Sequence, residues 1–450
     1  MMLPNQKILY KDIVFRLLVL VFGFCDLALA KTPIYILGLY PITGSWPAGE
    51  TILAASRLAA EHVNQDSRIL RDYELVIIPT DSACNGGRGV DTMYKELYNS
   101  SLSKIMIIGA GCSVATEPTA ESSHYWNLIQ ISYAANSPEL SYRDMYPRFF
   151  RLSLSEYMFN PMRIAVIKHF GWSRVATIHQ RADFFSLGDA DFRKQAAAVG
   201  VEIITSEPFT DDPLSQVNNI KRLDARIILC NSYEPQARKV FCAAWKAGLY
   251  GRKYVWIIPA WFQTYWWRIR NPEENIDCTI EQMDEATKGY LGVYQIIFLE
   301  NGGDDTLSGK STSDYINGLK EKMGEDVEFQ FGFQEAAYGY DTIWTMALAL
   351  NKTEAHLKAI DPLRSIADFN YEDEEIGNIL LEKVTNTKFQ GLTGTVQFLD
   401  TGDRRGIVKL TQNHNGSEEV VALFDLSEPE GNQLSFLNET QIIWNGKCLK

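Results

Sequence analysis

Short apolar runs alternate with helix-length segments along most of this chain. The runs are nearly continuous in apolar residues, which predicts strands covered by helices on both faces. The intervening segments carry apolar residues three and four positions apart, which predicts helices. The predicted strands span 33–39, 75–79, 105–108, 175–179, 201–205, 226–229 and 254–258, and the predicted helices 50–63, 90–98, 160–170, 190–198 and 235–247. This alternation is typical of a doubly wound α/β fold with a parallel-core sheet.

The alternation continues for nearly twice the length of one such sheet, which takes roughly 120–150 residues, so we expect two α/β lobes. From about Gly394 the pattern changes to strands, which we expect over 395–399, 406–412 and 419–425. A further helix is expected over 341–350, and Glu335 precedes it. Three alternatives stay open for that acid: it is solvated, it caps the helix, or it points into a cleft.

The first 30 residues have the layout of a secretory signal peptide. Lys7, Lys11 and Arg16 precede an apolar run over 17–24, and Ala28-Leu29-Ala30 has the pattern of a cleavage site. The run is shorter than the ~20 apolar residues of a membrane span, and a buried first helix is the alternative. No later stretch reaches about 18 consecutive apolar residues. We therefore expect cleavage after Ala30, secretion, and no membrane span in the chain as given.

Secretion changes the interpretation of the cysteines and asparagines. Cys25 is lost with the signal, and the six cysteines that remain become disulfide candidates in an oxidising compartment. None lies in a CxxC pair or at zinc-finger spacing, so we expect no metal site. Four N-x-[ST] sequons predict glycosylation, at Asn99, Asn351, Asn415 and Asn438.

Charge and motifs exclude several classes of protein. There are 43 basic and 56 acidic residues, a net charge of −13, whereas a nucleic-acid-binding protein needs a basic face. The chain contains no GxSxG elbow, no Walker lysine loop and no HExxH pair, and its six histidines are scattered. We therefore expect no enzyme, no cofactor and no nucleic-acid partner.

The glycine-rich turn over 107–114 is the nearest approach to a nucleotide motif. The dinucleotide fingerprint needs a third glycine where Val114 stands. A turn into a helix start nevertheless offers free backbone N–H groups and the positive end of the helix dipole. Together with the Ser113 hydroxyl this predicts an anion site, and a plain strand-to-helix turn is the alternative.

A group of aromatic residues follows the last predicted strand, where ligands of open α/β sheets gather. Its members are Trp256, Trp261, Phe262, Tyr265, Trp266 and Trp267. Aromatic faces can bind an ammonium group by cation–π attraction, and core packing is the alternative for most of these rings.

Many short blocks in a fixed order give the chain a resemblance to a known family. They are Gly38-Leu39-Tyr40-Pro41, Trp46-Pro47, Asp72-Tyr73-Glu74-Leu75, Gly111-Cys112-Ser113, Trp126-Asn127-Leu128-Ile129, Phe149-Phe150-Arg151, Ala237-Arg238-Lys239-Val240-Phe241-Cys242, Lys253-Tyr254-Val255-Trp256, Gly332-Phe333-Gln334-Glu335-Ala336, Tyr340-Asp341-Thr342-Ile343-Trp344 and Asp368-Phe369-Asn370-Tyr371. Over about 32–425 this succession resembles the extracellular domain of metabotropic GABA receptors of the GABA-B type, within the class C G-protein-coupled receptors. The resemblance implies a periplasmic-binding-protein-like Venus flytrap, with ligand in a cleft between two lobes.

The resemblance also implies domain limits and disulfides. Lobe 1 would comprise 32–152 plus 287–393, lobe 2 would comprise 153–286 plus 394–432, and 433–450 would be a tail leading toward an absent membrane domain. The implied disulfides are Cys84–Cys112 and Cys242–Cys278. Cys230 lies in an apolar strand and is expected to be a free buried thiol, and Cys448 has no assigned partner.

The family's ligand contacts map onto positions of this sequence. Ser113 would hold the ligand carboxylate, Glu335 would pair with its ammonium, and Trp46 would line lobe 1. This suits GABA, a zwitterion that needs anion donors at one end and an acid with aromatic faces at the other.

Four further positions complete the implied site. Tyr233 and Trp261 from lobe 2 would close on the ligand. Two positions depart from the family, because Asn136 replaces a second carboxylate-binding serine and Ser153 replaces a histidine contact. Both side chains can still donate to a carboxylate.

The expected function is therefore a receptor ectodomain that binds GABA, closes on it, and transmits closure through a heterodimer formed by lobe 1. Coupling to a G protein would need a membrane domain that this chain lacks. The chain would lie outside the plasma membrane, or be secreted if it is a soluble truncated form acting as a decoy.

The alternative is a partner subunit that binds no ligand and acts in dimerisation and trafficking. The family's partner subunit lacks the acid and the tyrosine that this chain has at Glu335 and Tyr233, which favours the ligand-binding type. The segments 307–311 and 366–371, by contrast, resemble the partner subunit more closely.

Overall fold

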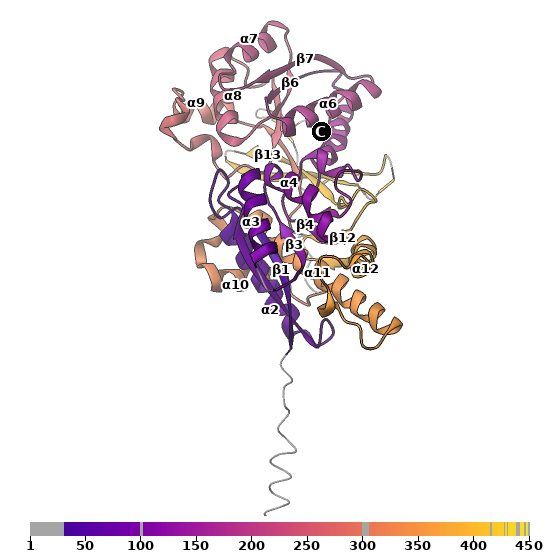
Figure 1. The fold of residues 1–450 in the computed structure, drawn as a ribbon. Coiled ribbons are helices and arrows are strands. Elements are labelled where there is room, and N and C mark those ends of the chain that lie inside the picture. The colour runs from indigo at the N-terminus through magenta and orange to yellow at the C-terminus, as the bar shows by residue number, and fades with distance from the viewer. Residues whose placement is uncertain are drawn as a thin grey trace, which may run out of the picture.

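A computed structural model describes residues 31–99, 102–298, 306–414, 416–426, 428–429, 431–437, 442–444 and 447–448. The predicted signal peptide and the sequons at Asn415 and Asn438 lie outside these residues. The described chain forms two α/β lobes, which lie one above the other in Figure 1. Both sheets have parallel cores with helices between successive strands, which confirms the predicted fold class.

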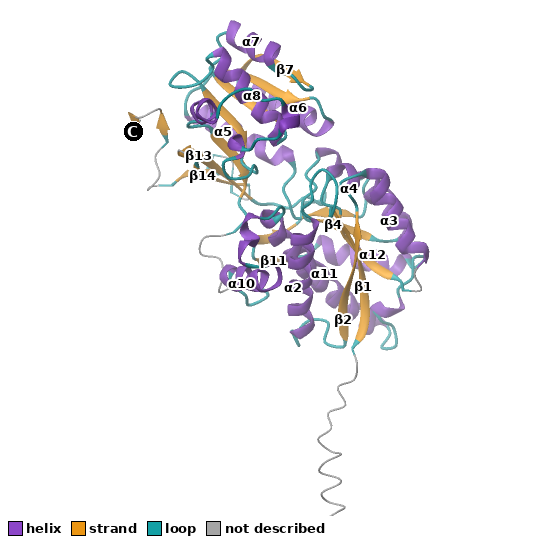
Figure 2. Ribbon diagram, turned by 90° about the vertical axis from the view of Figure 1, so that its left-hand side faces the viewer, coloured by secondary structure: helices purple, strands orange, loops and turns teal. Residues whose placement is uncertain are grey.

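Lobe 1 is built on a five-stranded parallel sheet in the order β2-β1-β3-β4-β5. The strands are β1 (Thr32–Tyr40), β2 (Tyr73–Asp81), β3 (Lys104–Gly109), β4 (Ile129–Ser132) and β5 (Phe149–Arg151). The helices are α2 (Gly49–Gln65), α3 (Gly86–Asn99), α4 (Ser113–Ser123), α10 (Thr312–Met323), α11 (Phe333–Ile360) and α12 (Glu374–Thr385). One core joins the first part of the chain to the later helices, because α11 packs along α2 (Figure 2).

Lobe 2 is built on an eight-stranded mixed sheet in the order β15-β14-β13-β10-β9-β8-β6-β7. The strands are β6 (Arg174–Gln180), β7 (Glu202–Phe209), β8 (Ile227–Asn231), β9 (Val255–Pro259), β10 (Leu291–Gln295), β13 (Ile407–His414), β14 (Ser417–Asp425) and β15 (Leu434–Phe436). Its helices are α5 (Asn160–His169), α6 (Asp183–Ala198), α7 (Leu214–Arg222), α8 (Glu234–Ala247) and α9 (Ile280–Ala286). Two apolar clusters form its core.

Short elements complete the described chain. The 3-10 helices are η1 (His124–Trp126), η2 (Pro138–Ser141), η3 (Glu156–Phe159), η4 (Trp266–Arg268), η5 (Pro272–Glu274), η6 (Glu325–Phe329) and η7 (Ile366–Asp368), and the remaining strands are β11 (Lys388–Gly391), β12 (Gly394–Gln397), β16 (Ile443–Trp444) and β17 (Lys447–Cys448). In the described residues, no helix combines the length and the apolar character needed to cross a bilayer.

Two of the expected lobe limits are wrong. β10 was expected in lobe 1, but it pairs with β9 and β13 in the lobe 2 sheet, because both of its faces are buried there. The chain therefore leaves lobe 2 after Gln295 rather than at 287. β12 was expected in lobe 2, but it forms a hairpin with β11, and Phe389 and Val396 of that hairpin pack against the lobe 1 core.

Three stretches of chain cross between the lobes, and we call them together the hinge. The first crossing follows β5, the second follows β10, and the third runs from β12 to β13. A bonded network of side chains holds the first and third crossings together, as described below.

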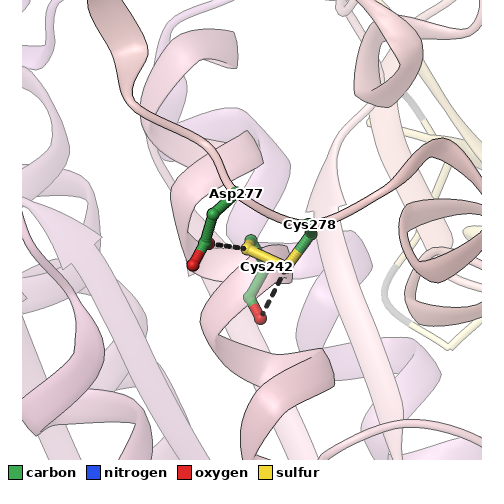
Figure 3. Close-up of side chains that lie close together, drawn as sticks. All are labelled: Cys242, Asp277 and Cys278. Carbon is green, nitrogen blue, oxygen red and sulfur yellow. Dashed lines mark hydrogen bonds between the residues drawn. A yellow bond between two sulfur atoms is a disulfide. The ribbon is translucent and has the colours of Figure 1, made fainter.

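The structure contains both expected disulfides. Cys84 bonds to Cys112, with Cα atoms 5.3 Å apart, and joins the loops that follow β2 and β3. Cys242 bonds to Cys278 beside the carboxylate of Asp277, as Figure 3 shows. The two sulfur atoms are bonded to each other, so this group does not form a metal-ligand set.

Cys230 is a free buried thiol in β8, as expected from its apolar surroundings. Burial raises its pKa to about 12, because the thiolate is poorly solvated there.

We predict that Cys84→Ser lowers the free energy of unfolding by about 2–5 kcal/mol, because the closed loop no longer constrains the unfolded chain. Denaturant unfolding of the purified chain measures this change. The double substitution Cys84→Ser/Cys112→Ser is the control and should match the single substitution. An unchanged unfolding midpoint would contradict a stabilising role for this bridge.

Candidate functional site

Four of the expected ligand contacts lie at one edge of lobe 1. In a parallel sheet the carboxyl ends of all strands meet at the same edge. Trp46 follows β1, Ser113 follows β3, Asn136 follows β4 and Ser153 follows β5. The sheet therefore gathers these side chains although they are spread over more than a hundred positions.

The glycine-rich turn after β3 is shaped by close packing. Gly109 has φ +102°, and a Cβ there would clash with the carbonyl oxygen of Leu39. A Cβ on Gly111 would lie 2.8 Å from Cζ3 of Trp46 and 2.9 Å from Cε2 of Tyr133. The glycines thus allow β1 and two aromatic rings to approach the turn, which explains them without a nucleotide.

Ser113 is the first residue of α4. Its Oγ accepts a hydrogen bond of 3.1 Å from the backbone N–H of Ser137. The hydroxyl hydrogen is therefore free to be donated to another group. The residue before it, Cys112, provides no side-chain cap, so the first N–H groups of α4 receive no oxygen from that position. These are the donors that an anion requires.

A buried arginine at the end of β5 positions the loop that carries Asn136. Arg151 is fully buried and donates 3.1 and 2.7 Å hydrogen bonds to the carbonyl oxygens of Ala135 and Ser137. The same guanidinium makes a 2.6 Å ion pair with Asp403 in the third crossing and a 2.8 Å bond to Ser141. One side chain therefore fixes the anion-site loop, the first crossing and the third crossing together.

Ser153 lies in the first crossing and is buried. Its Oγ is 3.5 Å from the carbonyl oxygen of Ala135, beside Asn136. The backbone oxygen of Asn136 in turn accepts a 3.0 Å bond from the N–H of Glu156, which belongs to lobe 2. The two departures from the family pattern are thus neighbours at the point where the lobes meet.

Glu117 is a residue of this region that the sequence did not single out. It lies in α4, one turn after Ser113, and the Ser137 side chain lowers the pKa of its carboxyl group. Burial raises its pKa, and Glu139 and Asp183 raise it further. The sequence could not predict that Glu117 lies near Ser137, because only the fold brings Ser137 to α4.

The lobe 2 contacts form an aromatic pair. Tyr233 follows β8 and Trp261 follows β9, at the carboxyl edge of that sheet. Their ring centroids are 5.6 Å apart in an edge-to-face arrangement, and the Tyr233 ring also contacts Phe185 at 4.9 Å. Tyr233 remains 47% exposed. By contrast, Trp256, Phe262, Trp266 and Trp267 are buried, which supports the core-packing alternative for these rings, whereas Tyr265 is exposed.

Glu335 lies in the first turn of α11, which begins eight residues earlier than the helix predicted from Asp341. The residue before the helix, Gly332, has φ +81° and packs against the backbone of Ala48, two positions after Trp46. The start of α11 is thereby held beside the segment that carries Trp46.

The carboxyl group of Glu335 has no hydrogen-bond or ion-pair partner among the side chains that the structure describes. Burial raises its pKa to about 7, because the ionised form is poorly solvated there. Its charge also raises the pKa values of the buried Tyr294 and Tyr338, where burial is the larger cause. An unpaired, half-buried acid is a candidate binding group for a cation.

The structure therefore gathers Trp46, Ser113, Asn136 and Ser153 at one edge of lobe 1. It pairs Tyr233 with Trp261 on lobe 2, and it holds Glu335 near the Trp46 segment.

The sequon residues Asn99 and Asn351 lie in helices of lobe 1. Asn99 ends α3, and Asn351 lies in α11, where its Oδ1 accepts a 3.0 Å bond from the N–H of Leu70.

The chain is similar to known proteins over most of its length. A protein-family profile described as the receptor family ligand binding region matches residues 51–413. The chain is 35% identical over 400 residues to gamma-aminobutyric acid type B receptor subunit 1 of Mus musculus, covering 89% of this chain and 41% of that protein. It is 33% identical over 409 residues to subunit 2 of Homo sapiens, covering 90% and 42%. It is also 33% identical over 417 residues to subunit 1 of Caenorhabditis elegans, covering 92% and 45%. The chain thus spans about two fifths of the length of the curated relatives it matches.

We predict that Arg151→Met lowers the free energy of unfolding by about 3–5 kcal/mol, because it leaves the Asp403 carboxylate buried without its partner. Urea unfolding measures the loss. Adding Asp403→Leu should recover most of it, since the unpaired charge is then gone. If the second substitution instead adds to the loss, the ion pair does not explain the effect.

Proposed function

The chain belongs to the family of receptor ligand-binding regions, and from that premise we propose that it binds GABA or a closely similar amino acid between its two lobes. The relatives named above are receptors, so we further propose an extracellular receptor part without catalytic activity. The observation that carries the proposal is the half-buried Glu335, which has no side-chain partner among the described residues and lies beside the segment that carries Trp46.

The anionic end of the amino acid would bind at the start of α4. The Ser113 hydroxyl and the first N–H groups of that helix are donors at one place. Asn136 would offer a further amide donor from the neighbouring loop, and Arg151 keeps that loop in position.

The cationic end would bind at Glu335. An ammonium group there supplies the positive charge that the carboxylate lacks in the unliganded chain, and it stabilises the ionised form. The Trp46 ring on lobe 1 and the Trp261 ring on lobe 2 offer aromatic faces to the same cation.

Tyr233 and Trp261 would couple binding to movement of the lobes. They stand on lobe 2, whereas the polar groups at both ends of the ligand stand on lobe 1. A ligand that touches both lobes stabilises the arrangement in which they are close, and the hinge converts this preference into a change of shape.

An aromatic patch on lobe 1 supports assembly with a second subunit. Tyr94, Tyr98 and Trp126 form a cluster with centroid distances of 5.3–6.2 Å, and Tyr98 is 73% exposed. Exposed aromatic clusters are typical of protein interfaces. We propose that a second GABA-B-type subunit covers this patch to form a heterodimer, and that coupling to a G protein takes place in a part of the relatives that this chain does not span.

The same patch would serve a subunit that only assembles. This is the second candidate function, and the relatives include both subunit 1 and subunit 2. Glu335 and Tyr233 favour the ligand-binding candidate, because an assembly subunit has no use for an unpaired acid at a half-buried position.

We predict that isothermal titration of GABA into the purified chain gives a saturable heat, and that Glu335→Gln weakens binding about 10- to 100-fold. The substitution keeps the shape but removes a charge-assisted bond to the ammonium. Glu321→Gln, at an exposed position of α10, is the matched control and should leave the affinity unchanged. Absence of heat at millimolar GABA would leave the assembly candidate.

We predict that the affinity for GABA falls about tenfold between pH 8 and pH 6. The pKa of Glu335 is about 7 in the free chain, so below pH 7 binding of the ammonium must expel a proton, whereas above it the carboxylate is ready. The amine and the carboxylate of GABA keep their charges over this range.

Glu335→Gln should abolish this pH dependence, because the amide does not titrate over this range. Titrations at several pH values in buffers of equal ionic strength measure these slopes. A wild-type affinity that rises on acidification would be incompatible with the role given to Glu335.

A further inference from the structure

A cavity of about 330 Å³ lies within the hinge and lacks an assigned function. Its lining includes residues of all three crossings: Leu152 and Leu154 of the first, Ile296 of the second, and the segment 404–407 of the third. The rest of the wall comes mainly from the β11–β12 hairpin and from Tyr338 of α11. None of the expected amino-acid contacts lines it, so it is separate from the site described above. Its volume is at the lower end of the range for small-molecule sites, which is roughly 300–1,000 Å³.

The hairpin presents a polar face to this cavity. Lys388 lies opposite Gln397, and Gln390 lies opposite Thr395, so the four side chains share one face of the two strands. All four line the cavity. The opposite face carries Phe389 and Val396, which pack against the lobe 1 core and thereby fix the polar face in place.

Two cations of this wall have no counter-ion. The Lys388 ammonium and the Arg405 guanidinium make no hydrogen bond or ion pair within the part of the chain that the structure describes. They flank Gln397, because Lys388 is its cross-strand neighbour and the N–H of Arg405 donates a 3.2 Å bond to its carbonyl oxygen.

A third cation lies deeper in the wall. Arg404 is buried, and its guanidinium donates to the neutral oxygens of Thr393 and Thr395, with the charge of Asp341 nearby. Asp425 is the acidic side chain in the lining, so the cavity wall carries three basic groups and one acidic group. This balance favours an anionic occupant.

Most of the remaining wall is apolar, with Gln295 and Thr393 as its polar members. Leu152, Leu154, Ile296 and Ile407 line the cavity, and the ring of Tyr338 adds to them. A wholly hydrated ion such as chloride or sulfate would leave this surface without a partner.

We propose that the hinge cavity binds a small amphipathic organic anion, with its acidic group between Lys388 and Arg405 and its apolar body against the leucines and isoleucines of the crossings. Because an occupant touches all three crossings, it stabilises one relative position of the lobes and so modulates their movement. This site is independent of the amino-acid site proposed above, and binding is measured without an amino acid present.

Titration calorimetry with sodium octanoate at constant ionic strength tests the proposal. We expect saturable binding of octanoate and much weaker binding of octan-1-ol, which has the same apolar body without the charge. Lys388→Gln/Arg405→Gln should weaken octanoate binding about tenfold or more, because both charge-assisted contacts are lost. Thr395→Trp, at an exposed position of the cavity wall, should abolish binding by filling the space while both cations remain.

Melting curves of each variant establish that it is folded, and Thr395→Trp decides the question if the double variant does not fold. No binding of octanoate up to 10 millimolar (about ten-thousandfold above micromolar affinity) would overturn the proposal. Equal binding of octanoate and octan-1-ol, or octanoate binding that Thr395→Trp leaves unchanged, would overturn it as well, because the ligand would then bind at another surface.

Discussion

The buried ion pair between Arg151 and Asp403 joins the end of β5, where the first crossing begins, to the third crossing of the hinge. Each group would be costly to bury alone, so the two elements that carry them must stay adjacent. Arg151 also holds the carbonyl groups of the loop at Asn136, and its own N–H bonds to the oxygen of Gly402. The part of the candidate site at Ser113 and Asn136 is consequently fixed to the hinge rather than to a free loop. Because Arg151 bonds to both Asp403 and Ser137, a shift of the third crossing would also move Ser137. The N–H of Ser137 in turn bonds to Ser113.

Burial changes the electrostatic behaviour of two acids in the region of the candidate site. Burial raises the pKa of Glu335 to about 7, so its neutral and ionised forms are both populated near neutral pH. A cation bound nearby would favour the ionised form. In α4, Glu117 is half-buried, and burial raises its pKa as well.

The fold class followed from the sequence because buried parallel strands leave a strong apolar signal. The runs at 33–39 and 105–108 lie inside β1 and β3. β4 and β5 were not predicted as strands, since each has only three or four residues. The lobe limits were misplaced at β10 because a buried strand does not reveal which sheet it joins.

The disulfide pairing came from the resemblance and not from cysteine spacing. The resemblance also supplied the candidate ligand contacts, whose roles remain proposals. It did not lead to Arg151 or Glu117, because their importance depends on contacts with residues far away in the chain. Arg151 belonged to a matching block, but the sequence gives no sign that its partner is 252 positions later.

The passage of the chain through both lobes has a consequence for biosynthesis. The sheet of lobe 1 is complete at Arg151, yet α11, which covers α2, begins only at Phe333. At about 5–20 residues per second, a ribosome needs roughly 10–40 seconds to make the intervening segment. During that time the first half of lobe 1 emerges with an uncovered apolar surface. Until the late helices arrive, this surface is open to association with other chains or with chaperones.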